Sequence, residues 1–216
     1  KPLFKGHYQP KVPADLGYYD LRVPETRREQ AELARQYGIE GFCYWHYWFG
    51  NGRQLLQRPF QEVLASGEPD FPFCLAWANH SWEDKQFNKE GGNKMLMEQL
   101  YPGDEDYIAH FNAVLPAFKG PRYIRVNGEP LFMIYAPMKV PDIAHFIELW
   151  QKLAKPHGFR IHFVGHTSKT EELPLFRQWG FNATNLVRLF DVFQKNYSLL
   201  GRIKTKFQRI TFHQGQ

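Results

Sequence analysis

The sequence has little cysteine, no long apolar run and no glycine-rich phosphate loop. Its 216 residues include two cysteines, Cys43 and Cys74, each inside an apolar segment that predicts a buried side chain. Two thiols exclude a disulfide framework, and no CxxC or His/Cys spacing indicates zinc. No apolar run approaches the roughly 20 residues that a membrane-spanning helix needs. We predict a domain without a metal or other cofactor and, since no signal peptide is visible, a cytoplasmic one.

An excess of charge of one sign is also lacking over most of the chain. The net charge of +5 comes entirely from residues 186–216, where six basic residues stand against Asp191 alone. A domain that binds nucleic acid needs basic residues spread over one face, so no nucleic-acid partner is predicted. The basic residues predict a solvated helical tail, and weak contact with an anionic membrane surface or an acidic partner is the second interpretation.

Helical and strand-like segments alternate along the remaining sequence. Helices are predicted at 24–37, 58–66, 104–119, 141–158 and 173–180, and apolar strands at 39–49, 71–79, 129–137, 159–168 and 181–187. Asn127-Gly128 predicts a tight hairpin turn before the third of these strands. This alternation is typical of a parallel sheet covered by helices, and a doubly wound sheet and a (β/α)8 TIM barrel both fit it.

The predicted strands end in rings and polar groups, which favours the barrel. Active sites of barrels are built at the carboxyl ends of their strands, and no GxGxxG or Walker motif supports a nucleotide crevice instead. We predict one barrel-type domain over residues 1–185 and a separate tail over 186–216.

Aromatic residues are abundant, at 17% of the chain, and four of the six tryptophans fall within residues 45–82. Flat rings stack on the apolar faces of sugars, while amides and imidazoles bind their hydroxyl groups. The alternative for each ring is core packing, and for each histidine a structural role. The residues predicted to line a saccharide site are His7, Tyr44, His46, Trp77, Asn79, His80, Trp82, Tyr135 and His166.

Acidic candidates for catalysis are few. Cleavage of a glycosidic bond generally needs two carboxyl groups on opposite sides of it. Glu83 and Asp84 follow Trp82, and Glu98 lies in a segment, 80–103, predicted to be a long loop. Glu83 is the predicted catalytic acid, but the sequence offers no convincing pair.

Four long motifs carry a resemblance to a known family. They are residues 4–22 (FKGHYQPKVPADLGYYDLR), 37–60, 70–82 (DFPFCLAWANHSW) and 122–137 (RYIRVNGEPLFMIYAP). Together they resemble the WbsX-like family, named for glycosyltransferases of lipopolysaccharide or O-antigen synthesis. That family is related to the glycoside hydrolase family 99 endo-α-mannosidases, which are (β/α)8 barrels. The resemblance implies a carbohydrate-active domain that acts on bacterial surface polysaccharide.

The sequence also departs from this family pattern. Family members have a first strand ahead of the segment that begins here and an Asn-Glu-Trp element on a late strand, and His80 stands where many have Glu. We therefore expect a partial barrel, about strands two to six. Three functional hypotheses follow: a transferase or hydrolase, a truncated sugar-binding remnant without catalysis, and, least favoured, a nucleic-acid binder through the tail.

Overall fold

The computed structural model describes residues 4–7, 13–84 and 94–189. The predicted tail therefore lies, from residue 190 on, outside the described residues. Five α-helices are described: α1 (Pro24–Gln36), α2 (Arg58–Ser66), α3 (Asp104–Lys119), α4 (Ile143–Ala154) and α5 (Leu173–Gln178). Each lies within a predicted helical segment. Short 3-10 turns, η1 (Pro137–Lys139), η2 (Lys155–His157) and η3 (Thr170–Glu172), follow β7, α4 and β8.

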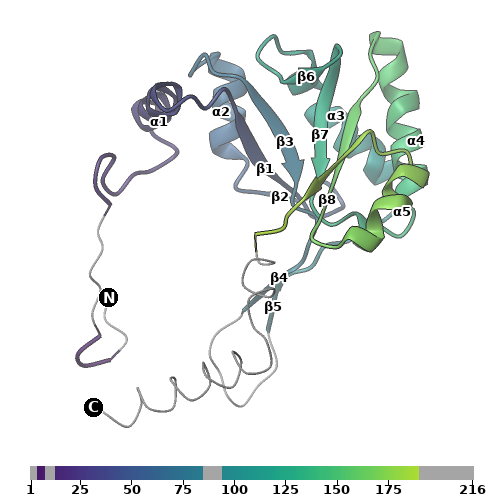
Figure 1. Cartoon of the computed structure of the whole chain (residues 1–216), viewed down its shortest axis with the longest axis horizontal. Coiled ribbons are helices and arrows are strands. Elements are labelled where there is room, and N and C mark those ends of the chain that lie inside the picture. The colour runs from purple at the N-terminus through teal and green to yellow at the C-terminus, as the bar shows by residue number, and fades with distance from the viewer. Residues whose placement is uncertain (1–3, 8–12, 85–93, 190–216) are drawn as a thin grey trace.

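A mostly parallel sheet forms the centre of the fold (Figure 1). Its order is β2-β1-β3-β7-β8-β9, and the pairs β1–β3, β3–β7, β7–β8 and β8–β9 are all parallel. The bounds are β1 (Phe42–Trp48), β2 (Gln54–Leu55), β3 (Phe73–Trp77), β7 (Glu129–Ile134), β8 (His162–Thr167) and β9 (Ala183–Leu186). Within the described ranges this sheet stays open, with β2 and β9 at its edges, so no closed barrel is present there.

Besides the antiparallel pair of β1 and β2, two further antiparallel pairs are described. β6 (Arg125–Val126) pairs with β7 through Asn127 and Gly128, which have φ angles of 51° and 83°. This confirms the tight turn predicted from the Asn-Gly pair. β4 (Trp82–Asp84) pairs with β5 (Lys94–Met97), so the segment predicted as a long loop is partly a hairpin.

In the part of the chain that the structure describes, helices pack against one face of the sheet. Phe73, Leu75, Trp77, Phe132, Ile134 and Phe163 point into this layer and are buried with Phe111 and Phe118 of α3 and Phe146 and Trp150 of α4. The indole of Trp150 lies at the centre of the layer, 4.9 Å from the ring of Phe132 and 4.7 Å from that of Phe146. A doubly wound sheet carries helices on both faces. The one-sided cover among the described residues therefore differs from a doubly wound sheet.

The opposite face is only partly covered. Trp45 is 49% exposed, and Cys43 is exposed, contrary to the prediction that both cysteines are buried, while its neighbour Cys74 on β3 is buried. The prediction was wrong for Cys43 because its side chain, like that of its register partner Cys74, points to the less covered face, and β1 lies nearer the edge of the sheet than β3.

A close approach between β8 and α5 occurs at Gly165. A Cβ atom built there would lie 2.6 Å from Cδ2 of Phe176, which is wholly buried. Glycine at this position therefore lets α5 lie directly on the strand.

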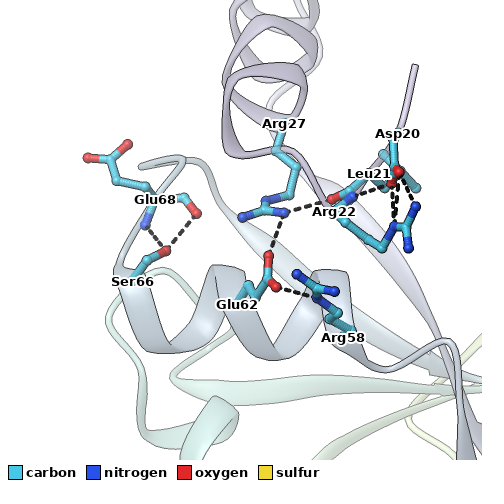
Figure 2. A network of polar contacts seen from close by, with 8 residues as sticks. All are labelled: Asp20, Leu21, Arg22, Arg27, Arg58, Glu62, Ser66 and Glu68. Carbon is cyan, nitrogen blue, oxygen red and sulfur yellow. Dashed lines mark hydrogen bonds and ion pairs between the residues drawn. The ribbon is translucent and has the colours of Figure 1, made fainter. Parts of the chain in front are cut away.

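A buried arginine joins the N-terminal part of the chain to the sheet's helical layer (Figure 2). Arg27 of α1 is 5% exposed, and its Nη1 donates to the Leu21 carbonyl at 2.7 Å and to Glu62 of α2 at 2.9 Å. Arg58 donates to the other Glu62 oxygen at 2.6 Å. Arg58, and to a lesser degree Arg27, hold the pKa of Glu62 below its ordinary value.

Two histidines are buried between the sheet and α3. His46 of β1 and His110 of α3 share a hydrogen bond of 2.9 Å between their Nε2 atoms, and His110 is stacked on Trp48 at 4.8 Å. Burial lowers the pKa of His46 to about 4 and that of His110 well below its ordinary value, to which the charge of His46 adds. Both rings are therefore neutral in the folded protein at pH 7.

Replacing Arg27 with Met should lower the free energy of unfolding by about 1–3 kcal/mol, because hydrogen bonds to a charged group are lost and the Leu21 carbonyl is left without its donor. Urea unfolding measures the change. Arg28→Met is the matched control, since Arg28 is the exposed neighbour on the same helix. Equal stability of the two variants would contradict the structural role of Arg27.

Stability should fall as the pH drops from about 6.5 towards 4. The unfolded chain binds protons at its histidines near pH 6.5, whereas folded His46 and His110 bind them only at lower pH, so protons favour unfolding. Each histidine adds a slope of about 1.4 kcal/mol per pH unit in that window. Urea unfolding at several pH values measures the slope. His110→Gln should reduce this slope, and an unchanged slope in that variant would contradict the contribution of the buried pair.

Candidate functional site

A pocket of about 820 Å³ opens on the uncovered face of the sheet. It lies towards the carboxyl ends of β7, β8 and β9, where the sequence predicts the site, and beside Cys43 and Trp45 of β1. Its walls include the rings of Trp45, Tyr135 and His166, the amide of Asn185 and the turns that follow β7 and β8. The parallel register aligns these strands, since Ile134 pairs with Gly165 and His166 with Asn185.

Tyr135 is the centre of a group of rings. Its ring is stacked on His166 at 4.7 Å, meets Trp45 edge-on at 5.3 Å and contacts His80 at 5.2 Å. Three of the predicted residues, His80, Tyr135 and His166, therefore come together, although they lie on three different segments of the chain. Apolar ring faces next to polar edges are the usual means of binding a sugar ring.

The state of His166 follows from its neighbours. The Asn185 amide nitrogen lies 3.1 Å from His166 Nδ1, and because an amide NH₂ only donates, Nδ1 accepts and the proton is on Nε2. Partial burial lowers the pKa of His166. At neutral pH the ring is thus an uncharged donor through Nε2, suited to a hydroxyl oxygen.

Asn79 has a structural task at the edge of this pocket. Its amide nitrogen donates to the Tyr101 hydroxyl at 3.0 Å and to the Ala136 carbonyl at 2.9 Å, and its amide oxygen accepts the Ala136 N–H at 2.8 Å. Its side chain is fully buried, with both donors in use. Direct contact with a sugar, as predicted, does not fit this placement; Asn79 instead fixes the backbone beside Tyr135.

One carboxylate lies in the pocket wall. Glu172 accepts the Thr167 hydroxyl at 2.6 Å through one oxygen, and the other lies 3.3 Å from the Lys169 ammonium. The Glu172 side chain is 14% exposed. Lys139, in η1, adds a second cation to the same wall. Sequence reasoning missed Glu172, since the residue follows the strand by five positions and belongs to no motif.

Three predicted residues face the helical layer instead of the pocket. Trp77 is 1% exposed and packs on Phe146, and its indole donates to the Trp48 carbonyl. His46 bonds to His110, as described above. Tyr44 packs against Phe60 and lines a different pocket, beside α2. The structure corrects the prediction that these three residues line the saccharide site, because the alternation of side chains along β1 and β3 points them to the helical face of the sheet.

The remaining predicted residues lie outside the described lining of the pocket. Trp82 of β4 packs edge-on against Tyr47 and Phe49, at 5.1 and 5.3 Å. His7 is stacked on Phe4 in the N-terminal segment. Glu83 is exposed on β4, so the catalytic role predicted for it stays a prediction and the carboxylate in the pocket is that of Glu172.

Two features are absent from the described residues. No group of three or more His, Cys, Asp or Glu side chains there could hold a metal ion. Among the same residues, none of the helices has the length and apolar character needed to span a bilayer.

Solved structures share the fold. The GH99 endo-α-mannosidase of Bacteroides thetaiotaomicron superposes with a TM-score of 0.54 at 16% identity, covering 81% of this chain and 46% of that one. The same enzyme with bis-tris-propane gives 0.50 at 16% identity, covering 81% and 49%. The architecture here is therefore an α/β fold with a mostly parallel sheet, similar to that enzyme.

Sequence comparison is more specific. Two proteins called "Uncharacterized protein WxcX", from two strains of Xanthomonas campestris pv. campestris, are each 37% identical over 184 residues, which is 84% of this chain. The chain spans about a quarter, 26%, of the length of these curated relatives. A family model described as Glycosyltransferase WbsX matches residues 1–213, and the chain belongs to that family.

Proposed function

We propose that this domain binds a saccharide in the pocket beside Tyr135, and that it is part of a carbohydrate-active enzyme of bacterial surface polysaccharide metabolism. The observation that carries the proposal is the ring group of Trp45, Tyr135 and His166 on the uncovered sheet face. Family membership supports a glycosyl substrate. The name of the structural relative, an endo-α-mannosidase, makes α-linked mannose the first sugar to test.

The one-sided helical cover also supports a partial (β/α)8 barrel. In such barrels helices lie outside, and the site lies at the carboxyl ends of the strands. The pocket has that position relative to β7, β8 and β9. Contact of the tail with a membrane surface and a cytoplasmic location stay predictions of the sequence.

A binding domain without catalysis of its own is the second candidate. The observation favouring it is the single carboxylate, Glu172, in the described lining of the pocket. Retaining and inverting glycosidases generally use two, about 5–10 Å apart. Incubation with α-manno-oligosaccharides and with sugar nucleotides plus acceptor, followed by chromatography of the products, separates cleavage, transfer and binding without turnover.

Calorimetric titration with α-manno-oligosaccharides and with sugar nucleotides tests the binding itself. Trp45→Ala and Tyr135→Ala should each weaken saccharide binding roughly 5- to 30-fold, as expected for one or two kcal/mol of stacking. Tyr37→Ala, which removes a ring 78% exposed at the end of α1, is the control and should bind as the parent does. Unchanged affinity in both pocket variants would exclude this site.

A further inference from the structure

We propose that Glu172 is the carboxylate that accepts hydrogen bonds from sugar hydroxyl groups in this pocket. The inference rests on the proposed function and assigns a specific role within it. The proposed acceptor differs from Glu83, which is exposed on β4 and lies outside the described lining of the pocket.

The position of Glu172 is set by the end of β8. The chain leaves the strand at Thr167, turns through η3 and reaches Glu172 at the start of α5. The Thr167 hydroxyl, itself buried, donates to Glu172 Oε2 at 2.6 Å and accepts the Lys169 N–H at 3.0 Å. Thr167 thus holds the turn and aims the carboxylate back towards the strand end.

The side chain of Glu172 does not cap α5. Glu172 is the residue that precedes the first turn of α5, where a side-chain oxygen would normally accept a backbone N–H of that turn. Its side chain makes no such bond. The carboxylate is turned instead to Thr167 and Lys169, which both line the pocket.

Glu172 supplies the one carboxylate in the described wall of the pocket. The neutral acceptors there are the hydroxyl groups of Tyr135 and Ser168 and the amide oxygen of Asn185, and the donors include the ammonium groups of Lys139 and Lys169 and His166 through Nε2. Sugar hydroxyls both donate and accept, and a hydroxyl that donates to a carboxylate makes a charge-assisted bond, roughly twice as strong as one between neutral groups. Each Glu172 oxygen has one partner and can accept about one more hydrogen bond.

The neighbouring glutamate offers a matched control. Glu171 belongs to the same turn but is exposed and is not among the pocket-lining residues. Glu171→Gln and Glu172→Gln make the same chemical change, one residue apart, on the two sides of the turn.

The experiment is calorimetric titration of the parent chain and of the Glu171→Gln, Glu172→Gln and Glu172→Asp variants. The probes are a set of oligosaccharides of mannose, glucose, galactose, rhamnose and N-acetylglucosamine. Glu172→Gln should weaken the sugars that the parent binds by about tenfold or more, as for a lost charge-assisted hydrogen bond. Glu172→Asp should recover part of the affinity, and Glu171→Gln should stay within about twofold.

Urea unfolding of each variant separates binding from folding. If Glu172→Gln loses affinity while its free energy of unfolding is unchanged, the result supports a direct contact with the sugar. If the loss of affinity follows a loss of stability and Glu172→Asp recovers no affinity, the proposal is overturned. Binding by Glu172→Gln equal to that of the parent overturns it as well and leaves the proposed function standing. Absence of binding by the parent to every probe refutes the proposed function itself.

Discussion

Packing of the sheet on α3 and α4 decides which side chains can reach a ligand. Phe132, Phe163 and Trp150 are fully buried in this layer, so no ligand in solvent can contact them. Because side chains alternate along a strand, committing one set of residues to this layer commits the other set to the opposite face. Trp45, Tyr135 and His166 are in that second set, so the pocket is lined by residues that alternate with core residues along the strands.

The sequence predicted the order and type of the elements well. Each helix and each strand of the parallel sheet follows from its apolar pattern, and the hairpin from Asn127-Gly128. Tyr135 and His166 were found because each comes at the end of an apolar run. Tyr44, His46 and Trp77 were misplaced because position near a strand end does not give the face. On β3, large Phe73, Leu75 and Trp77 alternate with small Cys74 and Ala76, and this signal indicates which set meets the helices.

Glu172 and the His46–His110 pair could not be read from the sequence for a different reason. The histidine pair depends on a contact between two elements that are distant along the chain. The position of Glu172 depends on a turn whose course has no local sequence pattern. His110 lies in the middle of an ordinary amphipathic helix, and only the fold brings it 2.9 Å from His46. Asn79 was recognised as special, but its bonds to Ala136 and Tyr101 required the paths of two later segments.

Gly165 links the packing on the helical face of the sheet to the position of Glu172. The absence of a side chain there lets Phe176 lie on β8, and Phe176 belongs to the same short helix that begins directly after Glu172. Even a methyl group at position 165 would force the Phe176 ring to shift, on the side of the sheet away from the pocket. A shift that reached the helix backbone would move the Glu172 carboxylate as well, so a buried residue outside the pocket lining can alter the shape of the surface that a ligand meets.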